Sequence, residues 1–179
     1  MALLDGGYGG SDTNYKYSFI LPDSWKTDTV SKVDKATNGT DARFVDPKNK
    51  EGAWATPRCA CRRCLLRSRV ALARAARAYV TSFSGYPRLK EDRRGIIDDL
   101  SLSDSTLQDA LSYADAVEVS ERTEDEQLYV DYDIIGGGRT IYATVTSDGA
   151  RLYALFCNGA TAATDEAYKA MRNSLRTIK

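Results

Sequence analysis

Residues 139–160 read RTIYATVTSDGARLYALFCNGA and contain the clearest strand pattern of the chain. Apolar and polar residues alternate on both sides of Asp148-Gly149, a dipeptide favoured where a tight turn needs a positive φ. The stretch is therefore predicted to form two antiparallel strands, 139–146 and 151–157, joined by a short turn.

Two further alternating segments precede this hairpin. Residues 115–122 and 127–135 have the same period of two, and the glycines 136–138 separate the second segment from the hairpin. Because the connections are short, consecutive strands are expected to pair with one another. The C-terminal half is thus predicted to be a four-stranded antiparallel meander.

The hydrophobic period becomes helical after the meander. Apolar residues recur on one face at Ala167, Tyr168, Met171, Leu175 and Ile178. Thr164 can cap this helix, and the acidic residues that follow it suit a first helical turn. We expect a C-terminal amphipathic helix that lies on the sheet.

Shorter patterns occupy the rest of the chain. Alternation predicts three strands, at residues 15–21, 40–45 and 79–84. Residues 104–114 have apolar positions at helical spacing, with Ser103 or Asp104 available as the cap. Strands with helices kept to one side predict an α+β fold, an antiparallel meander flanked by helices.

Length and composition suit a single domain over residues 1–179, since 42% of the 179 residues are hydrophobic. We expect residues 1–14 to be a flexible lead. The longest apolar runs fall short of the ~20 residues that a membrane span needs.

The formal charge of zero hides an uneven distribution. Residues 53–78 contain seven arginines and no lysine, aspartate or glutamate, and without them 18 basic residues face 25 acidic ones. This Arg/Ala-rich segment is interpreted as an inserted loop, such as retained intron sequence, with a basic docking loop for an acidic partner or anionic headgroups as the alternative. The acidic remainder would repel phosphates, which argues against nucleic-acid binding.

Three cysteines, Cys59, Cys61 and Cys64, lie within this segment as CACRRC. They could bind a soft metal or take part in redox chemistry, or one could pair with Cys157. However, a closed zinc site needs four ligands, and the chain has no histidine. Cys157 is in phase with apolar strand positions, so we interpret it as a small buried residue.

The residues suggest no enzyme. Histidine, the commonest general base, is absent, and no set of nucleophile, base and orienting group can be named. We therefore expect no catalytic residues, no cofactor-binding residues and no metal ligands, the three cysteines being the only weak metal candidates.

Several motifs, taken in order, resemble the PsbP family of extrinsic thylakoid-lumen proteins. They are YKYSFILPDSWK at 15–26, DARFVDPKNKEG at 41–52, YVTSFSG at 79–85, the hairpin at 140–160 and AYKAMRNSLRTI at 167–178. The resemblance covers nearly the whole chain outside residues 53–78, and its details favour the PsbP-like and PsbP-domain branch.

The resemblance implies a PsbP-like α/β sandwich in the chloroplast thylakoid lumen, peripheral to the membrane. It implies a non-catalytic subunit of photosystem II that supports the oxygen-evolving complex and its calcium and chloride retention. The expected partners are a photosystem core and other lumenal extrinsic subunits. The alternative within the family is an assembly or stability factor for photosystem I or another thylakoid complex.

Overall fold

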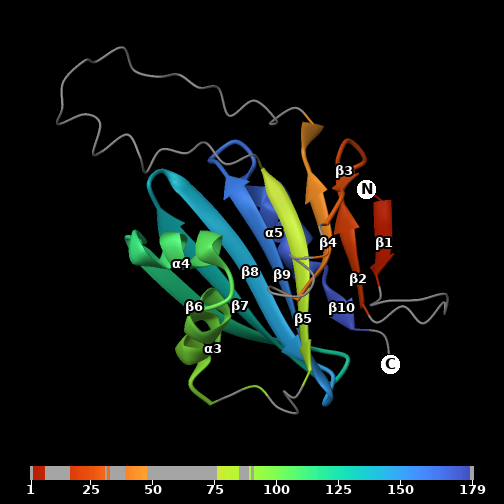
Figure 1. Ribbon diagram of the computed structural model, residues 1–179, viewed down its shortest axis with the longest axis vertical. Helices are drawn as coiled ribbons and strands as arrows, with labels where there is room; N and C mark the ends of the chain where they lie inside the picture. Colours follow the sequence, from red (N-terminus) through yellow and green to blue (C-terminus); the bar gives the residue numbers. More distant parts are fainter. Residues whose placement is uncertain are drawn as a thin grey trace.

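The computed structural model describes residues 2–6, 17–30, 32, 39–47, 76–84, 89 and 91–177. Its main element is an antiparallel seven-stranded sheet with the order β3-β4-β5-β9-β8-β7-β6 (Figure 1). The strands are β3 (Lys26–Asp28), β4 (Thr40–Val45), β5 (Arg77–Ser84), β6 (Ala116–Glu124), β7 (Gln127–Gly136), β8 (Arg139–Ser147) and β9 (Arg151–Ala160). The predicted α+β fold with an antiparallel meander, β6 to β9, is confirmed.

Both predicted turns of the meander have the backbone geometry that their residues favour. Gly137 and Gly138 have φ values of 59° and 74° in the turn between β7 and β8. In the turn between β8 and β9, the Asp148 carboxylate accepts hydrogen bonds from the backbone N–H groups of Ala150 and Arg151. Gly149 there has a φ of 92°, which residues with a β-carbon rarely adopt.

Two helices cover one face of this sheet, α3 (Arg93–Ser101) and α4 (Ser105–Ser112) (Figure 1). Asp104, one of the two predicted caps, accepts hydrogen bonds from the N–H groups of Thr106 and Leu107 and so begins α4. The buried residues of this layer are Ile96, Ile97, Leu100, Leu107, Val130, Tyr132, Ile134, Ile141, Ala143, Val145, Leu152, Ala154 and Phe156.

The opposite face is covered by α5 (Asp165–Asn173) and by a small sheet of order β1-β2-β10. Its strands are β1 (Ala2–Gly6), β2 (Tyr17–Leu21) and β10 (Arg176–Thr177). The second core includes Tyr17, Phe19, Leu21, Phe44, Ala78, Val80, Tyr142, Tyr153, Leu155, Cys157, Tyr168, Met171 and Leu175. The central sheet therefore buries apolar side chains on both faces.

Both ends of the chain differ from expectation. Residues 2–6 of the expected flexible lead form β1, because their backbone pairs with β2 from Ala2 opposite Leu21 to Gly6 opposite Tyr17. The other residues of the 1–14 range lie outside the described part of the chain. The lead is therefore partly a strand.

The C-terminal helix is shorter than its apolar spacing predicted. The Ser174 hydroxyl donates to the carbonyl of Met171 and accepts from the N–H of Ile20, so the chain leaves the helix beside β2. Arg176 then pairs with Ser18 in β10. Thr164 begins α5, yet its side chain makes no capping hydrogen bond within the helix.

The last three residues of the interpreted insertion, 53–78, belong to the described fold. Ala76 and Ala78 are buried, the carbonyl of Ala76 accepts from the N–H of Asp46 at 3.2 Å, and Arg77 pairs with Val45. Residues 53–75 lie outside the described residues. Because β4 and β5 are neighbours, the two ends of their connection meet at one end of this strand pair.

The turn at Gly149 supplies a first prediction. The substitution Gly149→Val should lower the free energy of unfolding by more than about 1 kcal/mol, because a β-branched residue resists the positive φ. No neighbouring atom lies within 4 Å of a β-carbon at this position, so crowding adds nothing. The matched control Ala150→Val adds the same side chain at an exposed neighbour without a positive φ and should change little. Equal urea midpoints for the two variants would contradict this turn.

The strand boundary supplies a second prediction. Deleting residues 53–75 should keep the free energy of unfolding within about 1–2 kcal/mol of the parent, because closure entropy changes slowly with loop length. Deleting residues 53–78 should cost more, since it also removes buried Ala76 and Ala78. Thermal melts of both variants and the parent, with and without a chelator, make the comparison. A large chelator effect in the parent alone would favour the cysteine metal site instead.

Candidate functional site

The sheet face beneath α5 changes from apolar to polar toward its β6 edge. One cross-strand row runs from Cys157 on β9 to Tyr142 on β8, Asp133 on β7 and Glu118 on β6. Cys157 is fully buried, whereas Glu118 is exposed. The polar end of this face contains the ion pairs of Arg122 and Arg172 and is therefore a candidate site.

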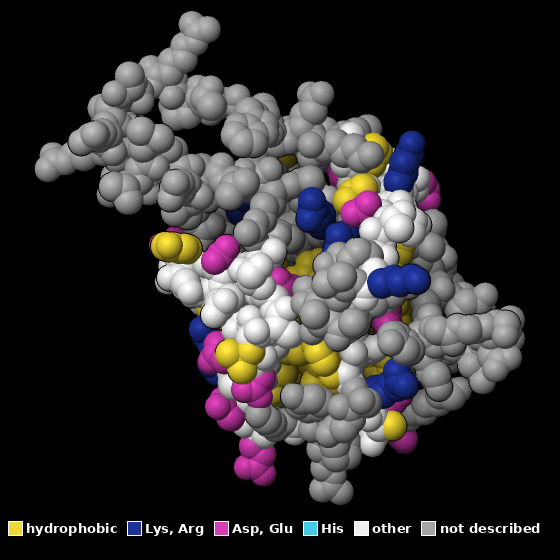
Figure 2. All heavy atoms as spheres, viewed as in Figure 1, with side chains coloured by type: hydrophobic (Ala, Val, Ile, Leu, Met, Phe, Trp, Pro, Cys, Tyr) yellow, Lys and Arg dark blue, Asp and Glu magenta, His cyan; other side chains and the backbone are white. Residues whose placement is uncertain are grey.

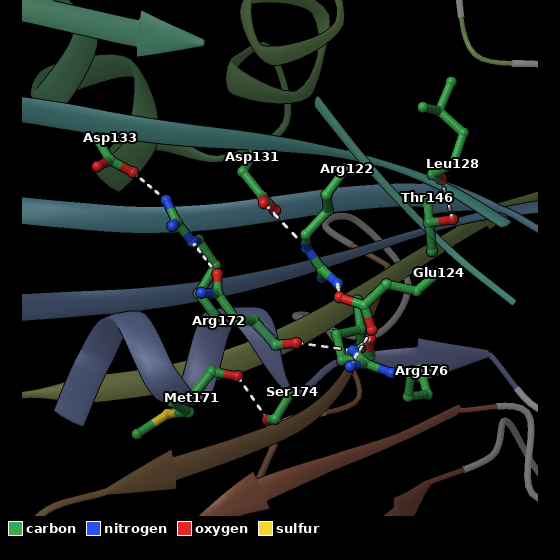
Figure 3. Close-up of polar contacts among 12 residues, drawn as sticks. Arg122, Glu124, Leu128, Asp131, Asp133, Thr146, Met171, Arg172, Ser174 and Arg176 are labelled. Atoms are coloured by element: carbon green, nitrogen blue, oxygen red, sulfur yellow. Dashed lines mark hydrogen bonds and ion pairs between the residues drawn. The ribbon is translucent and has the colours of Figure 1, made fainter. Parts of the chain in front are cut away.

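Arg122 on β6 lies at the centre of this polar region (Figure 3). Its Nε donates to Asp131 Oδ2 at 2.9 Å, its Nη1 donates to Glu124 Oε1 at 2.5 Å, and its guanidinium lies 4.2 Å from the centre of the Tyr129 ring. The other oxygen of Glu124 forms an ion pair with Arg176 of β10. The chain of contacts connects the edge of the large sheet to the small sheet.

A second polar contact fastens α5 to the same face. Arg172 forms an ion pair with Asp133 of β7 and donates to the side chain of Asn173 at 2.9 Å (Figure 3). Burial raises the pKa of Asp133, and the guanidinium of Arg172 offsets part of that shift. These charges are partners of one another and hold the C-terminal segment on the sheet, which is a structural role.

The tyrosines of the meander are also structural. Tyr129, Tyr132, Tyr142 and Tyr153 are buried, so they offer no exposed aromatic surface. Burial, followed by hydrogen bonds to Asp165 and Asp148 respectively, raises the pKa of Tyr142 and of Tyr153 to about 12. Neither hydroxyl is prepared to act as an acid or base near neutral pH.

The cysteines give no site within the described structure. Cys59, Cys61 and Cys64 lie outside the described residues, so their metal or redox role stays a prediction. Cys157 is a free, fully buried thiol whose pKa is raised by burial, which confirms its interpretation as a small buried residue. Among residues 2–6, 17–30, 32, 39–47, 76–84, 89 and 91–177, no three side chains of the types His, Cys, Asp and Glu group as metal ligands.

The outer surface is strongly polarised. Residues 91–126, which form α3, α4 and β6, contain twelve acidic and three basic side chains, a net charge of −9 in a chain whose total is zero. Figure 2 shows acidic side chains gathered over these elements, while most of the visible Lys and Arg side chains lie on the other side. A charge count in short windows would have found this segment from the sequence.

The same segment contains the large exposed apolar side chains. In the part of the chain that the structure describes, these are Leu102, Tyr113 and Val119, which are 80%, 62% and 39% exposed. Leu102 follows α3, Tyr113 follows α4, and Val119 lies on β6. Exposed apolar groups within a charged surface are typical of protein contacts, so this surface is the best candidate for a functional site.

Comparison with known proteins gives a sequence relative and a fold. The chain is 38% identical over 158 residues to the chloroplastic thylakoid lumenal 19 kDa protein of Arabidopsis thaliana, which covers 86% of the chain and 58% of that relative. The solution structure of cyanobacterial PsbP from Synechocystis sp. PCC 6803 superimposes with a TM-score of 0.59 at 18% identity, over 98% of the chain and 92% of that structure. No protein-family model matches the chain.

The fold is therefore that of PsbP, and the resemblance indicated by the sequence motifs is confirmed. The chain is related in sequence to a thylakoid lumenal protein, and it spans about 58% of that relative's length. Within the described residues, no helix has the length and apolar character to cross a membrane.

The network around Arg122 supplies a third prediction. Asp131→Asn should lower the free energy of unfolding by about 2–3 kcal/mol, because it leaves a largely buried guanidinium without its innermost carboxylate. The side chains of Arg122 and Asp131 are only 17% and 5% exposed.

Asp98→Asn is the matched control for this prediction. Asp98 pairs with Arg94 on the surface of α3, where the two side chains are 53% and 46% exposed. The same chemical change should there cost less than about 0.5 kcal/mol. Chemical denaturation of both variants measures the difference, and equal losses would show that the Arg122 network contributes no more than a surface pair.

Proposed function

We propose that this chain is a non-catalytic extrinsic protein of the chloroplast thylakoid lumen that docks peripherally on a photosynthetic membrane complex. The observation that carries the proposal is the 38% identity, over 86% of the chain, to a protein named for the thylakoid lumen. The PsbP fold and the polarised charge of the surface support docking as its mode of action.

We further propose photosystem II as the complex, with the chain supporting calcium and chloride retention by the oxygen-evolving complex. The support is the structural likeness to cyanobacterial PsbP together with the PsbP motifs of the sequence. In this mechanism the chain holds neither ion itself. It covers the lumenal surface beside the ions and slows their exchange with solvent, and the photosystem core and other lumenal extrinsic subunits are its partners.

The rigidity of the module suits this role. The ion pairs of Arg122 and Arg172 tie the C-terminal segment to the sheet, and the sheet buries apolar residues on both faces. A rigid module loses little conformational entropy when it docks, so its surface charges can set the orientation and the rate of association. The carboxylates of Asp131 and Asp133 hold the fold through their ion pairs with arginine, which supports a role without catalysis.

A salt wash tests the proposal and supplies a fourth prediction. Thylakoid membranes should release the protein in 1 M salt, because screening shortens from ~10 Å at 0.1 M to ~3 Å at 1 M. Binding of the purified chain to salt-washed photosystem II membranes should restore part of the oxygen evolution that is lost when calcium and chloride are low.

Photosystem I membranes are the control in this experiment. Preferential binding there would favour the assembly or stability factor and overturn the photosystem II assignment. Retention through the salt wash, with release only by detergent, would contradict peripheral docking altogether.

A further inference from the structure

We propose that the outer surface of α3, α4 and β6 is the docking face of the protein, and that its partner is a basic protein surface with apolar pockets between its Lys and Arg side chains. This inference rests on the proposed function and specifies the face and the chemistry of the partner. Hereafter the docking face means residues 91–126 apart from Glu118, Arg122 and Glu124, whose side chains lie on the α5 face of the sheet.

The apolar side chains are the first argument. Leu102 lies two residues before Asp104, the cap of α4, and Tyr113 directly follows the helix. The two most exposed large apolar residues of the described chain therefore lie at the two ends of one eight-residue helix of about 12 Å. Single exposed apolar residues scattered over a surface are normal and do not indicate a binding site, whereas clustered ones do. Here Val119 on the adjoining strand brings all three into the same segment.

The fixed position of the two helices is the second argument. The Tyr79 hydroxyl of β5 donates to Asp104 Oδ2 at 2.5 Å, and Asp104 also caps α4. The Tyr132 hydroxyl of β7 donates to the backbone carbonyl of Arg93 at 2.5 Å, at the start of α3. Each helix is thus attached to the sheet by a tyrosine, and Leu102 and Tyr113 are presented from a rigid base.

Charge selects the kind of partner. Glu118, Arg122 and Glu124 lie on the face beneath α5, and without them residues 91–126 contain ten acidic and two basic side chains, a net charge of −8. This charge attracts a surface rich in Lys and Arg, and it repels both phosphate backbones and anionic lipid headgroups. The partner is therefore a basic protein surface. Tyrosine is enriched among the side chains that dominate protein interfaces, so Tyr113 is the expected anchor, with the acidic residues setting register around it.

The test compares sets of exposed substitutions in binding to salt-washed thylakoid membranes. One set removes the apolar anchors, Leu102→Ser with Tyr113→Ser. A second reverses charge on the docking face, Asp109→Lys with Asp115→Lys. The matched control makes the same change of charge elsewhere on the surface, Asp23→Lys with Glu166→Lys, and all four carboxylates are on exposed residues.

We expect each docking-face set to weaken membrane binding at least tenfold and the control set to change it less than twofold, with melting temperatures close to the parent. A carbodiimide that joins carboxylates to amines in contact should link the parent protein to partner lysines through residues 91–126. Because cross-linking uses the unaltered chain, it gives a result even where a variant folds poorly.

The outcomes separate the two proposals. If the parent binds and the control set weakens binding as much as the docking-face sets, this face is not the docking face, while peripheral docking stands. Cross-links between copies of the chain would replace the basic partner with self-association and overturn the inference. If the parent does not bind the membranes at all, the proposed function fails and the inference fails with it.

Discussion

The register between β8 and β9 is the constraint on which the rest of the structure depends. Pairing of Tyr142 with Cys157 and of Ala143 with Phe156 sends alternate side chains into two separate cores. A slip of one residue would exchange the two faces of a strand. It would move Tyr142 from beneath α5 to beneath α3 and α4, and both layers would lose their complementary surface.

This register separates the charged side chains that stabilise the fold from those that are exposed to a partner. On the α5 face, apolar rows give way to charged rows at β7 and β6. There the guanidinium groups of Arg122 and Arg172 neutralise the buried carboxylate of Asp131 and the partly buried carboxylate of Asp133. Those charged side chains pair with one another and hold the C-terminal segment on the sheet. On the other face, α3 and α4 complete the core and leave their outer sides to solvent, so the charge that can act on a partner lies there.

The sequence predicted the elements that local pattern defines. Alternation and turn residues located the meander, since Gly137, Gly138 and Gly149 occupy positive φ. It did not predict β1, β3 or β10, because such short strands exist through pairing with distant residues, as Arg176 pairs with Ser18. Nor did it predict α3, although Asp92 accepts from Gly95 N–H as its cap and Ile96, Ile97 and Leu100 have helical spacing.

The docking face could be predicted only in part. The sequence showed that the chain is acidic outside residues 53–78, but exposure of Leu102 and Tyr113 depends on how α4 packs, which the pattern alone does not specify. The overlap of the Arg-rich segment with β5 was not predicted for a similar reason. Ala76 and Ala78 resemble the segment in composition, yet their burial is set by pairing across to β4 and β9.

Hydrogen–deuterium exchange of the membrane-bound protein locates the docking face. It measures which backbone amides become protected when the protein binds its partner, and it requires no substitution. We predict slower exchange on binding for amides within residues 91–126, with β3 and β4 unchanged. Slower exchange confined to β3 and β4, at the opposite edge of the sheet, would contradict it.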